Sequence, residues 1–203
     1  DIYHAETMSD VVLDGLDRAL ADADLGVMLE FFESDRGQRI VALELSAREA
    51  LLDKEVEVLS ELKFEEMQQG GDPRLDLLAG FIEANDLIES NVVGGLNSSF
   101  AFYQGLQEGG AFEEAFSEDQ ILADVWAQES DIRADTTQWI YSYLALAYQP
   151  LEDADIMAYT EFSLTPDGQL LNQALFDAFD DMYTGISRAL GRTAAQYLTG
   201  EDI

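Results

Sequence analysis

The sequence predicts an all-α fold, a multi-helix bundle with an internally duplicated helix-turn-long-helix unit. Two observations predict the helices. Only three prolines occur in 203 residues, and each stands outside the periodic apolar segments. Apolar residues recur at helical spacing along the chain, and the strict alternation that is typical of strands is hard to find. A third observation predicts the duplication, because residues 20–38 match residues 151–169.

The first half of the chain divides into four predicted helices. Ser9 can cap the first, and a short second helix follows over residues 25–32. From residue 38 to residue 69 there is no glycine or proline, so one very long helix is expected. Counted from residue 35, it would be about 52 Å long at 1.5 Å per residue. Gly70 and Gly71 end it, and Asp72 as cap with Pro73 at the first helical position opens the next helix.

The second half is less regular at its start. The pairs Gly94-Gly95 and Gly109-Gly110 enclose a segment rich in Asn, Ser and aromatic residues, for which a broken helix and a partly ordered loop both remain open. Ser117 followed by Gln120 fits a capping box, which predicts that a helix begins there. A further helix is expected over residues 132–148, and two more complete the chain.

The duplication is visible when the chain is compared with itself at an offset of 131 residues. Eight of nineteen positions are identical between the two segments, where chance would give about one or two. In each copy a short helix precedes a turn and a second helix, with Ser34 or Thr165 as the N-cap residue. Gly37 and Gly168 then fall inside the first turn, where glycine destabilises a helix. We therefore expect the short helix to pack closely against each glycine.

These residues carry a family resemblance. The pattern F-[FS]-x-[ST]-x-x-G, at residues 31–37 and 162–168, resembles the bacterial family called domain of unknown function 2059. The resemblance covers both copies and the segment that links them. It implies an all-helical fold and an exported protein, and because the family has no established activity it implies no catalytic or binding residue.

The expected organisation is a single all-helical domain over residues 1–203. The first repeat unit is expected over about 20–69, the linking helices over about 72–149 and the second repeat unit over about 151–199. A chain of this length and 47% hydrophobic content can bury one sizeable core.

Charge excludes two classes of partner. The chain carries 42 acidic and 10 basic residues, a formal net charge of −32. Nucleic acid and anionic membrane surfaces would be repelled, whereas cationic partners remain open. No apolar run approaches the length of a membrane span. The sequence begins with Asp1 rather than methionine, which leaves open a removed signal peptide or a shortened chain. A periplasmic or secreted location is what the family resemblance implies, with the cytoplasm as the alternative.

Glu30 and Glu161 occupy the same position in the two copies, each beside a phenylalanine. A buried acid needs a partner, so we expect a bracing interaction with Arg36 or Arg39 in the first copy. In the second copy the candidates are Arg188 and Arg192. The alternative is that the two glutamates act as paired carboxylates in acid-base chemistry, although nothing in the sequence brings them together.

Two further groups are candidates for ligand binding. Arg188 and Arg192 lie four residues apart on the last predicted helix, where they can pair with carboxylates or hold an anionic ligand. Trp126 and Trp139, with Tyr141, Tyr143 and Tyr148, can line a pocket for an apolar or sugar ligand, but their helical spacing favours a place in the core.

The sequence contains none of the usual catalytic or metal-binding patterns. Cysteine is absent and His4 is the single histidine, so thiolate sites and the paired Glu-x-x-His motifs of di-metal bundles are excluded. Asp22 and Asp24, and likewise Asp153 and Asp155, lack the glycine and the final glutamate of a calcium loop. We therefore predict no cofactor, no metal and no catalytic residue.

The function predicted from the sequence is a non-enzymatic, exported interaction or binding module, plausible as a homodimer formed through its long helices. The alternative is a small-molecule binder or a carboxylate-based enzyme that uses the aromatic central segment. A deep cavity with a polar floor would favour the alternative, and a filled core would favour the interaction module.

Overall fold

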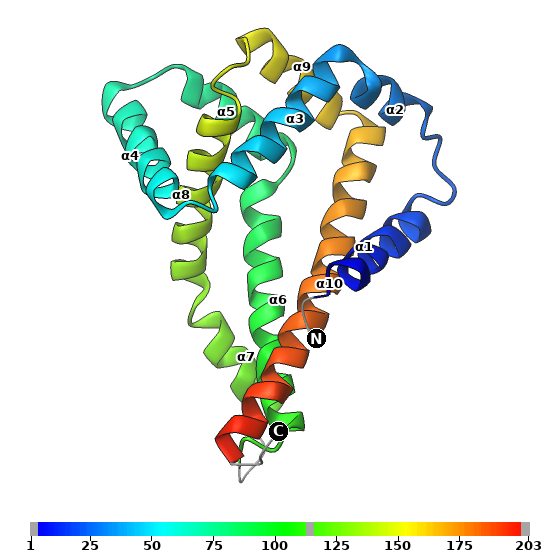
Figure 1. Ribbon diagram of the computed structural model, residues 1–203, viewed down its shortest axis with the longest axis vertical. Coiled ribbons are helices and arrows are strands. Elements are labelled where there is room, and N and C mark those ends of the chain that lie inside the picture. The colour runs from blue at the N-terminus through cyan, green and yellow to red at the C-terminus, as the bar shows by residue number, and fades with distance from the viewer. Residues whose placement is uncertain (1–3, 113–115, 200–203) are drawn as a thin grey trace. The chain divides into compact units, whose positions relative to one another are not determined.

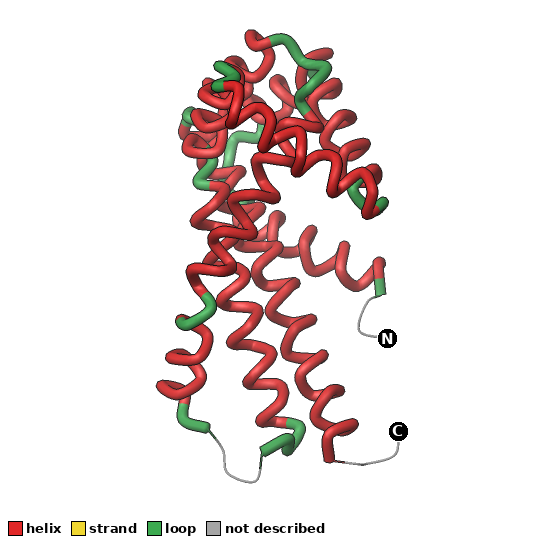
Figure 2. The backbone as a smooth tube through the Cα atoms, turned by 90° about the vertical axis from the view of Figure 1, so that its left-hand side faces the viewer, coloured by secondary structure: helices red, strands yellow, loops and turns green. Residues whose placement is uncertain are grey.

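The protein is described by a computed structural model that covers residues 4–112 and 116–199. Within these residues it forms ten helices and no strand, which confirms the predicted all-α class (Figures 1 and 2). The helices are α1 (Ala5–Ala19), α2 (Gly26–Glu33), α3 (Asp35–Ala50), α4 (Lys54–Gly70), α5 (Arg74–Ala84), α6 (Leu87–Glu108), α7 (Glu118–Trp126), α8 (Glu129–Ala147), α9 (Asp153–Ser163) and α10 (Pro166–Thr199).

The helices form two compact units, each assembled from separated parts of the chain. Unit 1 contains Asp1–Ala21, Glu89–Arg133 and Gln173–Ile203. Unit 2 contains Asp22–Ile88 and Ala134–Asn172. The predicted boundaries of the repeat units and linking helices do not coincide with these limits, and the single domain over residues 1–203 stays a prediction.

Unit 1 is held together by close helix crossings at glycine. A methyl group added at Gly105 of α6 would overlap the carbonyl oxygen of Arg188, and one added at Gly191 of α10 would overlap the carbonyl oxygen of Phe102. The two backbones therefore touch where the side chains are absent. Helix α1 has no buried residue, yet its Gly15 lies directly against Ala178 of α10.

The glycine-bounded central segment is a continuous helix, so both expectations for it, a broken helix and a partly ordered loop, were wrong. Helix α6 runs through Gly94 and Gly95 without interruption. A Cβ atom at Gly95 would lie 3.3 Å from a methyl carbon of Ile132, so glycine here allows close packing rather than a turn. Gly110, at φ 79°, follows the end of the helix.

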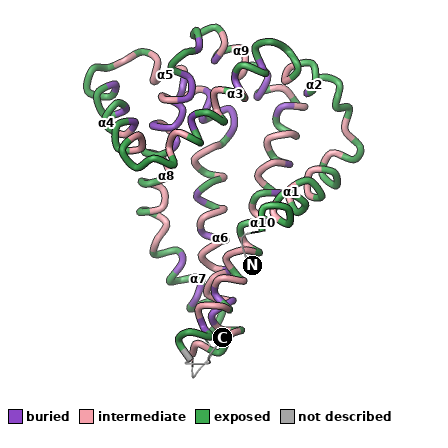
Figure 3. Tube along the Cα trace, in the orientation of Figure 1, coloured by how far each residue is buried: buried purple, intermediate pink, exposed green. Residues whose placement is uncertain are grey.

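Unit 2 is built around a core of large apolar and aromatic side chains. Phe81 of α5 contacts Tyr148 and Tyr159, with ring centroids 5.6 and 4.8 Å apart. Helices α5 and α9 pack along each other, and the buried part of each is visible in Figure 3. The remaining buried members of this core are Ile40, Ala47, Leu78, Ile82, Ile140, Tyr143, Leu144, Ala147, Leu151 and Ile156.

The single long helix expected after residue 38 is two helices, so that prediction was wrong. Helix α3 ends at Ala50, and α4 begins after Asp53, whose side chain accepts a hydrogen bond from the backbone N–H of Glu55 at 2.9 Å. Aspartate at an N-cap competes effectively with helix continuation. The long helix expected in the second copy is confirmed, because α10 contains 34 residues.

Four of the six predicted caps are confirmed, one is confirmed in part and one was wrong. Ser34 and Thr165 accept from the N–H groups of Gly37 and Gly168 at 3.1 and 3.0 Å. Ser117 and Gln120 form the capping box, and Gly71 ends α4 in the left-handed conformation. The side chain of Asp72 accepts from Arg74, although Pro73 precedes the first helical residue rather than occupying it. Ser9 lies inside α1, which begins after His4, so the first predicted cap was wrong.

Candidate functional site

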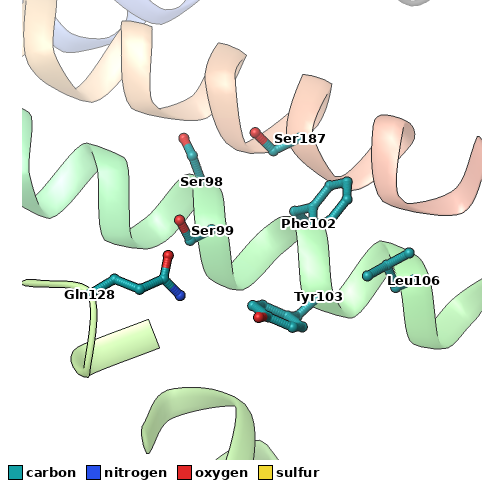
Figure 4. A pocket seen from close by; sticks show the side chains of 7 residues that line it. All are labelled: Ser98, Ser99, Phe102, Tyr103, Leu106, Gln128 and Ser187. Carbon is teal, nitrogen blue, oxygen red and sulfur yellow. The ribbon is translucent and has the colours of Figure 1, made fainter. Parts of the chain in front are cut away.

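An open pocket of about 450 Å³ lies in unit 1, along α6. Helix α6 contributes most of its lining, the turn between α7 and α8 contributes one residue, and α10 contributes another (Figure 4). The lining residues are Ser98, Ser99, Phe102, Tyr103, Leu106, Gln128 and Ser187. The aromatic central segment singled out in the sequence therefore contributes to a surface pocket through Phe102 and Tyr103.

The chemistry of this pocket is neutral. None of the seven lining residues is charged in a chain where 26% of residues are. Three serine hydroxyls and one amide offer hydrogen bonds, and two rings and a leucine offer apolar contact. The side-chain nitrogen of Gln128 donates to the carbonyl oxygen of Asp124 at 3.1 Å, which helps to fix the amide beside Ser99 and Tyr103 (Figure 4). The lining suits an uncharged polar ligand and contains no carboxylate, histidine or cysteine for acid-base or nucleophilic catalysis.

Glu30 and Glu161 are not buried, so the expectation that each needs a bracing partner was wrong. Both side chains are exposed, on α2 and α9. Arg36 donates to Asp155 at 2.8 Å, and Arg39 approaches the same carboxylate at 4.0 Å. The pKa of the Asp155 carboxyl is lowered, mainly by the hydrogen bond from Arg36. A role for either glutamate in ligand binding stays a prediction.

Arg188 and Arg192 pair with a carboxylate, which is one of the two roles predicted for them from the sequence. The carboxylate belongs to Glu108 and not to Glu161. Within unit 1, Arg188 donates two hydrogen bonds to Glu108, and Arg192 lies 3.5 Å from the other carboxylate oxygen. These contacts lower the pKa of the Glu108 carboxyl. The cluster joins α10 to the end of α6, and anion binding by the two arginines stays a prediction.

The aromatic candidates divide between core and surface. Tyr143 and Tyr148 are buried in unit 2, as expected, and Tyr141 stacks on Phe64 at 5.0 Å. Trp126 and Trp139 are exposed at 63% and 42%, so a place in the core was wrong for both tryptophans. Neither of them lines the pocket.

A half-buried acid, Glu44, was not predicted from the sequence. The carboxylate of Glu44 on α3 accepts a hydrogen bond of 2.6 Å from the hydroxyl of Tyr148. The backbone carbonyl oxygen of Glu44 accepts a second hydrogen bond, of 3.3 Å, from the hydroxyl of Tyr143. Burial raises the pKa of the Glu44 carboxyl, and the hydrogen bond from Tyr148 and the charge of Arg48 oppose this shift only in part. Burial also raises the pKa of Tyr148 well above its ordinary value. These side chains form a compact polar cluster in the core of unit 2.

A second surface feature lies on α4. Phe64 and Met67 bury one side of this helix in unit 2. On the opposite side Leu59 and Leu62 are exposed at 63% and 50%, and Leu52, in the turn before the helix, is exposed at 86%. Leu59 and Leu62 are three residues apart and lie on the same face of α4, while Leu52 precedes its N-cap residue Asp53. We call Leu52, Leu59 and Leu62 the leucine row.

Neither a metal-binding cluster nor a membrane-spanning helix occurs among the described residues. No group of three or more metal-ligating side chains gathers anywhere in residues 4–112 and 116–199. None of the helices described combines the length and the apolar character needed to cross a bilayer.

Comparison with known families adds one match, which covers the helix-turn-helix of the first copy. Residues 6–61 match a bacterial family. Its description is "Uncharacterized protein conserved in bacteria (DUF2059)", and the match confirms the resemblance over these residues. The DUF2059 match includes Ser34 and Gly37 and ends within α4; the second copy lies outside it. Neither a curated protein nor a solved structure matches the chain.

Proposed function

We propose that the protein is a non-enzymatic interaction module that associates with a second copy of itself through the leucine row of α4. The observation that carries this proposal is the exposure of Leu59 and Leu62 on one face of a helix whose other side is buried, with Leu52 exposed in the turn before it. Burying a leucine side chain fully is worth about 1.5–3 kcal/mol. A helix that presents such a row twice, once from each chain, forms an interface in which the same patch is used on both sides.

The charge of the chain determines how this association should respond to salt. Two chains of formal net charge −32 repel each other, and the exposed acids Glu55 and Glu66 flank the leucine row. Salt screens this repulsion and leaves apolar contact intact. Self-association therefore strengthens as salt is added, whereas binding of a basic partner would weaken.

The experiment replaces two leucines of the row together, Leu59→Glu and Leu62→Glu, and measures molar mass by static light scattering. The wild-type protein is expected to reach the mass of a dimer as concentration rises, and the double variant to remain a monomer. Leu13→Glu with Leu164→Glu is the matched control, because both leucines lie outside α4, are exposed at 56% and 62%, and together add the same charge. A wild-type monomer at every concentration, or a double variant that still dimerises, contradicts the proposal.

The proposal includes an internal repeat and an exported location. Supporting the repeat, Ser34 and Thr165 make the same capping bond, and a methyl group at Gly37 or Gly168 would overlap the carbonyl oxygen of Phe31 or Phe162. Support for export comes from the resemblance to the DUF2059 family and from the acidic composition. Fractionation of the native cell, followed by detection of the protein, tests the location: recovery with the cytoplasm would contradict export.

A second candidate function is binding of a small neutral molecule in the pocket beside α6, and the specific observation is its uncharged lining. A screen of melting temperature against neutral metabolites and saccharides tests it, because a ligand that binds the folded state raises its stability. Ser99→Leu is expected to fill the pocket and abolish the rise, while Ser9→Leu on the exposed surface of α1 leaves it unchanged. Absence of any ligand that depends on Ser99 would count against this candidate.

A further inference from the structure

We infer that the two helix-turn-helix segments of unit 2 are paired about a local two-fold axis, so that each copy is the binding partner of the other. This inference rests on the proposed internal repeat and goes beyond it, because a repeat alone does not say how its copies pack. The matching segments are residues 20–38 and 151–169, of which residues 22–38 and 151–169 lie in unit 2.

The decisive contact joins two equivalent residues. Phe31 and Phe162 occupy the same position in the two copies, and their rings stack with centroids 4.4 Å apart and planes 12° from parallel. In an interface with two-fold symmetry, a residue on the axis meets its own equivalent. Two rings that stack face to face across a two-fold axis lie parallel, which agrees with the 12° between the planes of Phe31 and Phe162.

A tandem stack, the common arrangement of repeated helical pairs, predicts something else. There each copy is displaced from the last, and packed helices stand about 8–10 Å apart, so equivalent residues are separated by the repeat spacing. Direct contact between Phe31 and Phe162 does not fit that pattern. The neighbouring rings agree with pairing, since Phe31 also stacks on Tyr159 at 5.3 Å and Phe32 meets Phe162 edge-on at 5.4 Å.

The polar contacts of the pair show how the copies have diverged. Arg36 of the first copy binds Asp155 of the second. The symmetry-related contact would join Asp167 to Asp24, because an offset of 131 turns Arg36 into Asp167 and Asp155 into Asp24. Two carboxylates would repel there, so the ion pair can form once only. Both copies thus contribute equivalent aromatic residues to the contact. The ion pair needs an arginine from the first copy and an aspartate from the second, so it favours pairing between the two different copies over pairing between two identical ones.

Spin labels on the full chain test the inference directly, because the wild-type sequence has no cysteine. The labels are introduced into the Leu59→Glu/Leu62→Glu variant. Dimerisation through α4 is thereby prevented, and only distances within one chain are measured. The first comparison uses exchanged pairs, Glu30→Cys with Leu164→Cys against Glu33→Cys with Glu161→Cys. All four positions are exposed, and residues 33 and 164 are equivalent, as are 30 and 161. A two-fold axis predicts the same interspin distance in both pairs.

The second comparison excludes a tandem stack. Equivalent pairs, Glu30→Cys with Glu161→Cys and Gln38→Cys with Gln169→Cys, must give one common distance if the copies differ by a displacement alone. A two-fold axis makes these distances unequal, because residues at different distances from the axis are separated differently from their equivalents. The inference would be overturned if the two exchanged pairs gave different interspin distances. It would also be overturned if the two equivalent pairs gave the same interspin distance. Circular dichroism of each labelled variant shows that the helices are retained, and the outcome is independent of dimerisation through α4.

Discussion

The α6–α10 crossing of unit 1 and the aromatic core of unit 2 achieve close packing in opposite ways. In unit 1, α6 and α10 approach until their backbones touch, at Gly105 and Gly191. In unit 2, aromatic rings fill the space between the helices, and the ring of Tyr159 contacts those of both Phe31 and Phe81. Close contact between backbones stabilises the glycine crossing of unit 1, whereas burial of apolar surface stabilises the aromatic core of unit 2.

The difference predicts opposite sensitivities to mutation. A crossing made by glycine has no room, so it should fail when atoms are added. A core made by rings should fail when atoms are removed, because the cavity left behind relaxes only in part. Substitutions that add atoms at the crossing in unit 1 and remove atoms from the core of unit 2 therefore test this difference.

The largest effect is expected for Phe81→Ala in unit 2. Phe81 is 4% exposed and contacts both Tyr148 and Tyr159. Its removal should lower the free energy of unfolding by about 3–5 kcal/mol, measured by urea denaturation. Phe179→Ala, at a ring of α10 in unit 1 that is 41% exposed, is the control and should cost far less. Equal losses would remove the proposed contrast between the units.

Addition of one methyl group should affect unit 1 next most strongly. Gly105→Ala places Cβ on the carbonyl oxygen of Arg188, a backbone atom that cannot move independently of α10. The expected loss is about 3 kcal/mol. Gly185→Ala on α10 is the matched control, since a methyl group there meets nothing within 4 Å. It should raise stability by up to about 1 kcal/mol through helix propensity. A neutral Gly105→Ala would show that the crossing is looser than described.

The helix caps should show no difference between the units. Ser34→Ala removes the cap of α3 in unit 2, and Ser117→Ala removes the cap of α7 in unit 1. Each should cost about 1 kcal/mol, because a cap acts on local backbone groups rather than on core packing. Chemical denaturation of both variants measures this, and a loss several times larger in one unit would mean that its cap also supports tertiary structure.

The smallest effects concern pH, and they should have opposite signs in the two units. The pKa of Glu44 is raised in the folded protein, so its contribution to stability falls as pH rises above the ordinary value of about 4.3. The pKa of Glu108 is lowered, so its contribution is present above that value and is lost as pH falls below it.

Melting temperatures of two glutamine variants across pH 4–7 separate these contributions. Glu44→Gln is expected to gain stability relative to wild type as the pH rises, because the buried negative charge is gone while an acceptor for Tyr148 remains. Glu108→Gln is expected to lose stability relative to wild type over the same range, since Arg188 and Arg192 lose their partner. Parallel pH profiles for the two variants would contradict the assignment.

Local signals predicted much of the fold and failed where two signals competed. The turns at Ser34, Gly71 and Ser117 were predictable because their residue types satisfy the backbone groups at a helix end. The break between α3 and α4 carries a signal too, Asp53 followed by Glu55 and Glu57 in the first turn, but an uninterrupted apolar pattern hid it. In α6, Gly94 and Gly95 are typical of a turn, and only tertiary packing makes them helical.

The candidate site was predicted in part. The aromatic central segment does border a pocket, but its other residues, Gln128 and Ser187, come from distant parts of the chain. Glu30 and Glu161 drew attention because both copies keep them, yet a repeat can preserve a surface residue as well as a buried one. Glu44 was overlooked because acidic residues are common throughout the chain, and its burial depends on contacts with α8 that sequence spacing does not reveal.

Sedimentation velocity of the wild-type protein over a range of concentrations, at low and at high salt, tests most directly the claim that the chain is an interaction module acting through α4. We expect a dimer whose dissociation constant falls as salt screens the charge of −32 on each chain. A protein that remains a monomer in high salt at every concentration would contradict it.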